Sequence, residues 1–343
     1  MIRYSGQPLP QNPRIAVIAN DAIGNFVIGT PLMQMLRDAH APRELVYFGG
    51  KRSQELSTAS DLIDSAFPLH GTNPRSAFAE ITEMTSNGGE FDLVVNIEWS
   101  RFAVTSASVL AGERTLVCGP SLDSEGRNLL PWPEDVQGKL WADQEWVDPN
   151  VCTRYPFLRT PFIGEIFCRL AYLEGAVPNY KVPTVVPTGK IPDVLIATSA
   201  SLVEKLWPVE KWQASLQALM ADGLSVGLIG AMPNPRRSYW EGDATEQLLV
   251  DSGLCEDFRG MWTLPEVAGA LTQARAVLSL DNGIMHLAVA SQTPTVALFR
   301  EGIHRLWTPP SPTLTPVVAN PGEPVADIAI ESVRSAMRKA LSS

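Results

Sequence analysis

The chain has 343 residues, of which 45% are hydrophobic and 19% charged, a composition typical of a soluble folded protein. Its net charge of −10 argues against non-specific nucleic-acid binding and against a polybasic membrane patch. Residues 1–160 carry a net charge of −6 and the remainder −4, so neither half is a basic module. At this length we expect two domains of about 150 residues each.

The four cysteines are scattered along the chain, without a C-x-x-C pair or clustered histidines: Cys118, Cys152, Cys168 and Cys255. This pattern predicts free thiols in a reducing cytosol and no zinc site. The N-terminus lacks the long apolar run of a signal peptide, and no apolar stretch reaches the roughly 18 residues of a membrane-spanning helix. We therefore expect a cytoplasmic protein with at most peripheral membrane contact.

The first half alternates apolar runs with helical patterns. Arg14–Ala19 is a short apolar run that enters the polar turn Asn20–Asn25, and a helical pattern follows over Phe26–Ala39. Three further segments are predicted as strands: Leu45–Phe48, Phe91–Ile97 and Leu116–Gly119. Strands that alternate with helices predict a parallel sheet with helices on both faces.

A region rich in Pro and Trp, roughly Leu130–Thr160, interrupts this rhythm. It is either a loop or lid on the acceptor side of an enzyme or an ordinary insertion. Pro161–Leu173 has a helical pattern. Val182–Pro192, with three prolines, is the best candidate for a linker between domains.

The second half repeats the alternation. Its predicted strands are Asp193–Thr198, Ser225–Ile229 and Ala276–Leu280, and its predicted helices are Pro208–Ala221, Thr245–Asp251, Leu264–Ala274 and Ile328–Leu341. Pro309–Pro324 is predicted as a loop. Each half therefore resembles a nucleotide-binding sheet domain, and a ligand cleft is expected between them.

Ser279–Phe299 is the most informative stretch of the chain. A strand end is followed by the turn Asp281-Asn282-Gly283, a helix that carries His286, a break at Thr293-Pro294 and a second apolar strand. This order places backbone N–H groups of a helix N-terminus just beyond a strand end, where α/β folds bind phosphate. Gly283 lets a diphosphate approach the main chain closely.

Four segments in order, Arg14–Arg37, Ile196–Trp212, Asp257–Ser279 and Leu280–Phe299, resemble glycosyltransferase family 9, the ADP-heptose:lipopolysaccharide heptosyltransferases. They are similar to the family's opening strand with its T-P-L helix, its lysine before W-P, and its D-x-G-x-x-H-type turn and helix. The resemblance implies an α/β protein of the GT-B fold, with two Rossmann-like domains whose parallel sheets face a central cleft. Residues 1–182 would bind the acceptor and 183–343 the nucleotide sugar, and the C-terminal helix could pack back on the first domain.

The resemblance also implies an inverting, metal-independent transferase with no cofactor, whose donor substrate is a nucleotide sugar, ADP-heptose by family analogy. Lys205 matches the lysine before W-P and would place an ammonium on the diphosphate, although a solvated surface lysine is the alternative. The other candidate donor-binding residues surround the strand ends of the second half: Thr198, Ser199, Ser201, Met232, Glu241, Asp281, Asn282, Gly283 and His286. Asp281 could also cap the helix that begins at Gly283, and this role is compatible with ligand binding.

The first turn departs from the family pattern, which has a general-base Asp directly after the glycine. This chain has Asn25 after Gly24, and an amide cannot take a proton at neutral pH. Asp21 or Glu98 could act as the base instead. Alternatively, the acceptor needs little assistance with deprotonation, or the chain is a catalytically silent family member that binds a nucleotide sugar or a protein partner.

The acidic first half disfavours a phosphorylated lipid A acceptor, although Lys51 and Arg52 form a small basic cluster. We therefore expect a smaller or uncharged hydroxyl acceptor, a glycan or a small molecule. A Rossmann-type oxidoreductase is a third hypothesis, but no G-x-G-x-x-G follows the first strand. The oligomeric state is left open.

Overall fold

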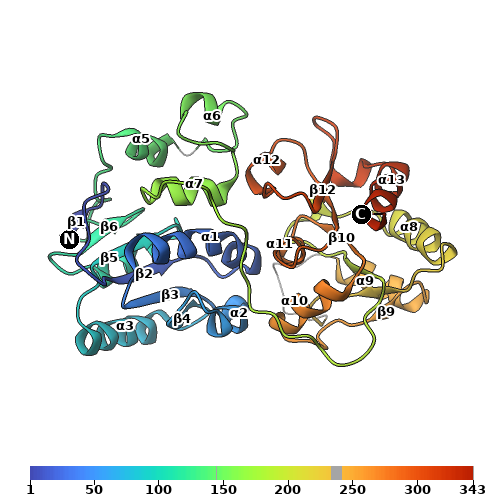
Figure 1. Cartoon of the computed structure of the whole chain (residues 1–343), viewed down its shortest axis with the longest axis horizontal. Coiled ribbons are helices and arrows are strands. Elements are labelled where there is room, and N and C mark those ends of the chain that lie inside the picture. The colour runs from blue at the N-terminus through green and yellow to red at the C-terminus, as the bar shows by residue number, and fades with distance from the viewer. Residues whose placement is uncertain (144, 233–241, 343) are drawn as a thin grey trace. The chain divides into compact units, whose positions relative to one another are not determined.

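The chain divides into two compact units, Met1–Lys181 and Val182–Ser343 (Figure 1). The computed structural model describes residues 1–143, 145–232 and 242–342. The division falls at the start of the proline-rich segment expected to be a linker, where a boundary after residue 182 is predicted. Which unit binds donor and which acceptor stays a prediction.

The first unit is built on a parallel sheet with the strand order β1-β6-β5-β2-β3-β4. Its strands are β1 (Ile2–Arg3), β2 (Arg14–Ile18), β3 (Glu44–Gly50), β4 (Ser65–His70), β5 (Leu93–Asn96) and β6 (Leu116–Cys118). Every residue of β2 and β5 is buried, as expected of central parallel strands that helices cover on both faces.

Helices cover both faces of this sheet. They are α1 (Ile23–His40), α2 (Gln54–Ala59), α3 (Pro74–Gly88), α4 (Arg101–Leu110), α5 (Val136–Asp143), α6 (Val151–Arg154) and α7 (Ile163–Leu170), with a 3-10 turn η1 at Lys51–Ser53. Phe48 of β3 shares a core cluster with Ile81 of α3 and Ala107 of α4, whereas its neighbour Tyr47 packs edge-on against Phe26 of α1. Because successive strand residues point to opposite faces, α3 and α4 cover one face and α1 the other.

The second unit has the same architecture, with the strand order β12-β11-β10-β7-β8-β9, all parallel. Its strands are β7 (Val194–Ala197), β8 (Val226–Leu228), β9 (Glu256–Asp257), β10 (Ala276–Leu280), β11 (Thr295–Phe299) and β12 (Leu314–Val318). Its helices are α8 (Val209–Ala221), α9 (Asp243–Asp251), α10 (Leu264–Gln273), α11 (Gly283–Ala290), α12 (His304–Trp307) and α13 (Ile330–Leu341), with 3-10 turns η2 (Val203–Lys205) and η3 (Val325–Asp327).

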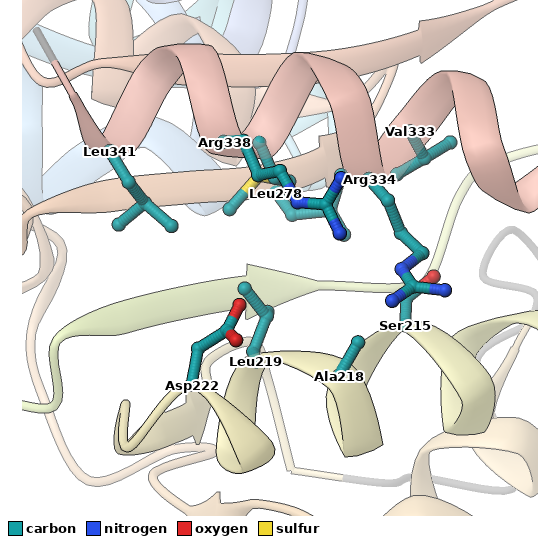
Figure 2. Close-up of a pocket in the computed structure, with 10 residues that line it drawn as sticks. Ser215, Ala218, Leu219, Asp222, Leu278, Val333, Arg334, Arg338 and Leu341 are labelled. Atoms are coloured by element: carbon teal, nitrogen blue, oxygen red, sulfur yellow. The ribbon is translucent and has the colours of Figure 1, made fainter.

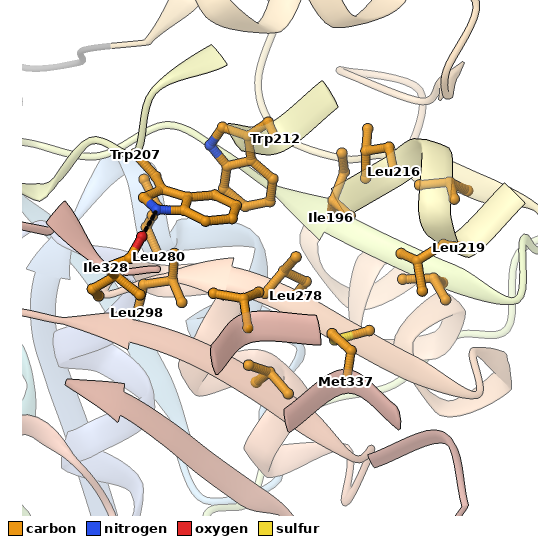
Figure 3. Packing of buried hydrophobic residues seen from close by; sticks show 14 of the residues in the cluster. Ile196, Trp207, Trp212, Leu216, Leu219, Leu278, Leu280, Leu298, Ile328 and Met337 are labelled. Atoms are coloured by element: carbon orange, nitrogen blue, oxygen red, sulfur yellow. Dashed lines mark hydrogen bonds between the residues drawn. The ribbon is translucent and has the colours of Figure 1, made fainter. Parts of the chain in front are cut away.

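Two tryptophans dominate the core of this unit (Figure 3). Trp207 and Trp212 meet edge to face at 5.3 Å between ring centroids, and both are fully buried. The Nε1–H of Trp207 donates to the Ile328 carbonyl oxygen at 3.0 Å. This bond satisfies a buried polar atom and holds the loop after β7 against the segment before α13.

The C-terminal region contributes to the core and to the sheet of the second unit. Val333, Met337 and Ala340 of α13 belong to its core, and packing of this helix on the first unit stays a prediction. The segment Pro309–Pro324 is not all loop, because β12 lies within it and pairs with β11. The proline in β12, Pro316, obscures the strand in the sequence and is tolerated because the strand lies at the sheet edge.

Candidate active site

The carboxyl ends of β7, β10 and β11 lie side by side, because these three strands are neighbours in a parallel sheet. The loop after β7 carries Thr198, Ser199 and Ser201, and Lys205 follows in η2. Asp281 and Asn282 follow β10 directly. Most of the predicted donor-binding residues are therefore gathered at one edge of the second sheet.

Lys205 and Asp281 form an ion pair at this edge. The Lys205 Nζ lies 2.6 Å from Asp281 Oδ2, and the two side chains are only 15% and 9% exposed. Lys205 is therefore not a solvated surface lysine. Asp281 is held by Lys205 in place of the helix-capping role considered for it.

The cap of α11 is Asn282. Its Oδ1 accepts from the backbone N–H groups of Ile284 at 2.9 Å and Met285 at 3.2 Å, and its Nδ2 donates to the Ser199 carbonyl oxygen at 2.9 Å. The expectation that Asp281 caps this helix is therefore wrong. Since Asn282 already occupies these two N–H groups, the helix N-terminus has fewer donors for a phosphate than the sequence suggests.

The three hydroxyl residues after β7 differ in burial. Thr198 and Ser199 are buried, whereas Ser201 is exposed. The Oγ1 of Thr198 is buried and has no hydrogen-bond partner among the described residues. A buried hydroxyl without a partner is costly, so Thr198 is the best hydroxyl candidate to meet a ligand here.

His286 lies on α11 and is 3% exposed. Burial lowers the pKa of His286 to about 4, while the Asp281 carboxylate raises that pKa and the Lys205 ammonium lowers it. The imidazole is therefore neutral at pH 7, with one N–H donor and one acceptor nitrogen.

This shift predicts a pH dependence of stability. The unfolded chain protonates His286 near pH 6.5, whereas the folded chain protonates it near pH 4, so between these values the unfolded state binds more protons. The contribution of His286 to the free energy of unfolding is constant above pH 6.5 and falls by about 3 kcal/mol on going down to pH 4. Urea unfolding of wild type and His286→Gln at pH 7.5 and 4.5 measures this. Equal pH dependence in the two proteins would contradict the assignment.

Methionines lie beyond β8 and β9. Met232 is 56% exposed and Met261 64%, and a Cβ placed on Gly260 would touch the Met232 side chain. Met232 is thus exposed, and its contact with a base stays a prediction, whereas the predicted Glu241 lies outside the described residues. Phe258 and Trp262 stack at 4.8 Å nearby.

Sequence reasoning missed Glu246, a fully buried residue of α9. Its Oε2 lies 3.6 Å from NH1 of the buried Arg259, which also pairs with Asp257 at 2.8 Å. Nothing in the helical pattern marks Glu246, because a Glu in an amphipathic helix is ordinarily on the solvent side. Glu246, Arg259 and Asp257 therefore form a largely buried charged cluster in the second unit.

The candidate bases lie at the carboxyl edge of the first sheet. Asp21 accepts from the Arg52 backbone N–H through Oδ1 and pairs with Arg52 Nε at 2.6 Å through Oδ2. The Asp21 carboxylate packs directly against Gly50 at the end of β3, because a Cβ placed on Gly50 would overlap it. Arg52 is thus engaged by Asp21, which weakens the basic cluster read from the sequence.

Glu98 is freer than Asp21. It follows β5, which neighbours β2, and only its Oε1 is hydrogen-bonded within the described residues, to the Ser100 N–H at 3.0 Å. Asn25 lies in the first turn of α1, half-buried, and its side chain makes no hydrogen bond with the described residues.

The tryptophans of the Pro- and Trp-rich region gather with Trp99. Trp132 stacks on Trp141 at 5.4 Å, and Trp99 lies 5.6 Å from Trp132. A groove of about 470 Å³ beside them is lined by Arg3, Ser5, Leu130, Pro131, Trp132, Pro133, Glu134 and Asp135. Among the described residues that line the groove, Arg3 is the one cation, and its guanidinium donates to four backbone carbonyls, of Val117, Gly119, Leu130 and Pro131.

A second cavity lies between α8 and α13 (Figure 2). Its volume is about 20 Å³, room for about one water, and none of its lining residues follows a strand end. It is a packing gap and not a substrate site.

The described residues contain no group of three or more His, Cys, Asp or Glu side chains placed to hold a metal ion. Over the same residues, no helix combines the length and the hydropathy that crossing a bilayer requires.

Solved structures resemble this chain over nearly its whole length. A glycosyltransferase family 9 protein from Veillonella parvula gives a TM-score of 0.73 at 14% identity, covering 97% of this chain and 98% of that one. Escherichia coli heptosyltransferase WaaC with ADP gives 0.66 at 15% identity, covering 95% and 99%. The iron-containing dodecameric glycosyltransferase TibC from enterotoxigenic E. coli gives 0.55 at 14%, covering 98% and 80%. No curated protein matches the chain by sequence.

Two parallel doubly wound sheets, with a charged site at a carboxyl edge, define the GT-B fold of glycosyltransferases, as these structural matches show. Residues 179–332 match the model of glycosyltransferase family 9 (heptosyltransferase). This match lies almost entirely in the second unit of the chain and covers slightly less than half of its residues. The resemblance read from the sequence is confirmed there, while Arg14–Arg37 lies outside the matched range.

Proposed function

We propose that the chain transfers a sugar, heptose by family analogy, from a nucleotide-diphosphate donor such as ADP-heptose to an uncharged hydroxyl acceptor. The observation that carries this proposal is the Lys205–Asp281 ion pair at the edge of the second sheet, within the range that matches the family. An ammonium there would neutralise charge on the diphosphate, and an aspartate beside it can accept from donor-sugar hydroxyls.

The proposed reaction is a single displacement with inversion. The acceptor oxygen bonds to the anomeric carbon as the bond from that carbon to the diphosphate oxygen breaks, and the electron pair leaves with the diphosphate. The acceptor proton goes to a carboxylate, for which we propose Glu98, because Arg52 already engages Asp21. We propose that protein cations stabilise the leaving group, so that neither a metal nor a cofactor is needed.

We propose that the acceptor binds in the groove beside Trp132 and is uncharged, because Arg3 is the one cation among the described residues that line this groove. The N–H groups of Arg3 are directed at carbonyls, and Glu134 and Asp135 would repel a phosphate. The four cysteines are free in the structure, which supports the proposed cytoplasmic location.

Asn25 favours one alternative, a family member that binds a nucleotide sugar without transferring it. Its amide sits in the turn where the family resemblance implies a base and cannot accept a proton.

The test is calorimetric binding and release of nucleotide diphosphate with a panel of nucleotide sugars, ADP-heptose included, with and without EDTA. We expect saturable binding of one donor and slow release that EDTA leaves unchanged. Loss of release in EDTA would overturn metal independence, for which the iron in TibC is a reason to test. Absence of any binding would overturn the proposed function, and binding with no transfer to any acceptor would favour the silent alternative.

A further inference from the structure

A second ion pair lies beside the first. Arg300 follows the last residue of β11, and its NH1 lies 2.9 Å from Oε1 of Glu204, the residue directly before Lys205. The Arg300 side chain is 28% exposed and that of Glu204 48%. The edge of the second sheet therefore carries two cations, Lys205 and Arg300, each held by a carboxylate.

Part of Arg300 has no partner. Its Nε is buried and donates to no acceptor among the described residues, although its NH1 is bonded to Glu204. The Oγ1 of Thr198 is likewise buried and has no hydrogen-bond partner among the described residues. Buried donors normally have acceptors, so two unsatisfied groups at one edge call for a ligand with several acceptor oxygens.

The position of these groups defines where the ligand would lie. Thr198 follows β7 and Arg300 follows β11, and these two strands flank β10, which ends at Asp281. Lys205, paired with Asp281, belongs to the same edge. A diphosphate has enough oxygens to accept from the ammonium, the guanidinium and the hydroxyl together.

We propose that Arg300 is a second cation for the donor's diphosphate and that Glu204 holds Arg300 until the donor binds. On binding, Arg300 exchanges the carboxylate of Glu204 for phosphate oxygens. A guanidinium is suited to this exchange because it bonds carboxylate and phosphate with the same planar fork of donors. The proposal rests on the proposed function, since the diphosphate is that of the donor.

The two residues of the pair are predicted to act in opposite directions. If the Arg300–Glu204 pair only stabilised the fold, neutralising either residue would have a small effect of the same sign, because surface pairs contribute little. If Glu204 competes with phosphate for Arg300, removing the carboxylate charge favours phosphate and removing the guanidinium disfavours it. The sign of the Glu204 effect therefore separates a binding role from a structural one.

The experiment is calorimetry of the full chain with inorganic pyrophosphate, ADP and adenosine. Arg300→Gln is expected to weaken pyrophosphate and ADP binding at least tenfold and to leave adenosine binding unchanged. Glu204→Gln is expected to tighten pyrophosphate binding severalfold, and Arg300→Lys to recover part of the loss. Arg305→Gln is the matched control, because Arg305 of α12 forms a comparable pair with Glu301 at 3.1 Å and its replacement is expected to have no effect.

Unchanged pyrophosphate affinity in Arg300→Gln, weaker binding in Glu204→Gln, or no pyrophosphate binding by the wild type would each overturn the proposal. Thermal melting of each variant checks folding. If Arg300→Gln does not fold, the pyrophosphate affinity of Glu204→Gln still tests the proposal. Failure of the proposed function is distinct: pyrophosphate would bind with the expected pattern while no nucleotide sugar bound or reacted.

Discussion

Replacing Glu98 with glutamine is expected to lower the turnover of sugar transfer about 10²–10⁴-fold, the usual effect of removing a general base. Glutamine keeps an oxygen for the Ser100 N–H bond, so the loop after β5 should stay in place while the proton acceptor is lost. The measurement is kcat with the donor that the nucleotide-sugar panel selects.

The control is Asp21→Asn. Because Asp21 is engaged by Arg52, this change should weaken the loop after β3 and lower thermal stability without abolishing turnover. The reverse result, with turnover lost in Asp21→Asn and kept in Glu98→Gln, would transfer the role of base to Asp21. Asn25→Asp adds a further check, since a silent protein should gain no activity from it.

Lys205→Gln is expected to lower the release of nucleotide diphosphate about 10²–10³-fold, comparable to the loss of one preorganised group that stabilises transition-state charge. The substitution also leaves the Asp281 carboxylate, 9% exposed, without its cation, so part of the loss will appear as weaker donor binding. Initial rates at several donor concentrations separate the effect on kcat from the effect on KM.

The neighbouring lysine provides the control for that experiment. Lys211 donates to the carbonyl oxygens of Ala326 at 2.7 Å and Ile328 at 3.0 Å, so Lys211→Gln should affect stability and leave kcat unchanged. Similar losses of kcat in both variants would show that Lys205 acts through the fold and not on the diphosphate.

The architecture was largely predictable because parallel strands covered on both faces are continuous apolar runs. Leu93–Asn96 and Ala276–Leu280 are buried throughout, and both stand out in the sequence. The edge strands β1 and β12 were missed because they are not continuous apolar runs. Two residues of β1, or a β12 that contains Pro316, give no periodic signal and are defined by the strand beside them.

The candidate site was predictable where a motif ties residues to strand ends, and unpredictable where contacts join distant segments. Asp281 and Lys205 were expected to be near each other as parts of one site, and the structure pairs them. The sequence suggested Asp281 as the cap of α11, whereas the structure has Asn282 there. Which of the two side chains reaches the first N–H groups of the helix is a geometric detail that composition does not encode. Arg300 was missed because the residue that it pairs with, Glu204, lies 96 positions earlier in the sequence.

The Trp207–Ile328 hydrogen bond and the packing of α13 have a consequence for the order of events during synthesis. The core of the second unit includes Val333 and Met337, so it stays incomplete until α13 has left the ribosome. The first unit, Met1–Lys181, has all of its core residues much earlier. Since domains generally fold as units from the N-terminus, a chain stalled before α13 carries a finished first unit and a second whose tryptophans remain exposed to chaperones and proteases.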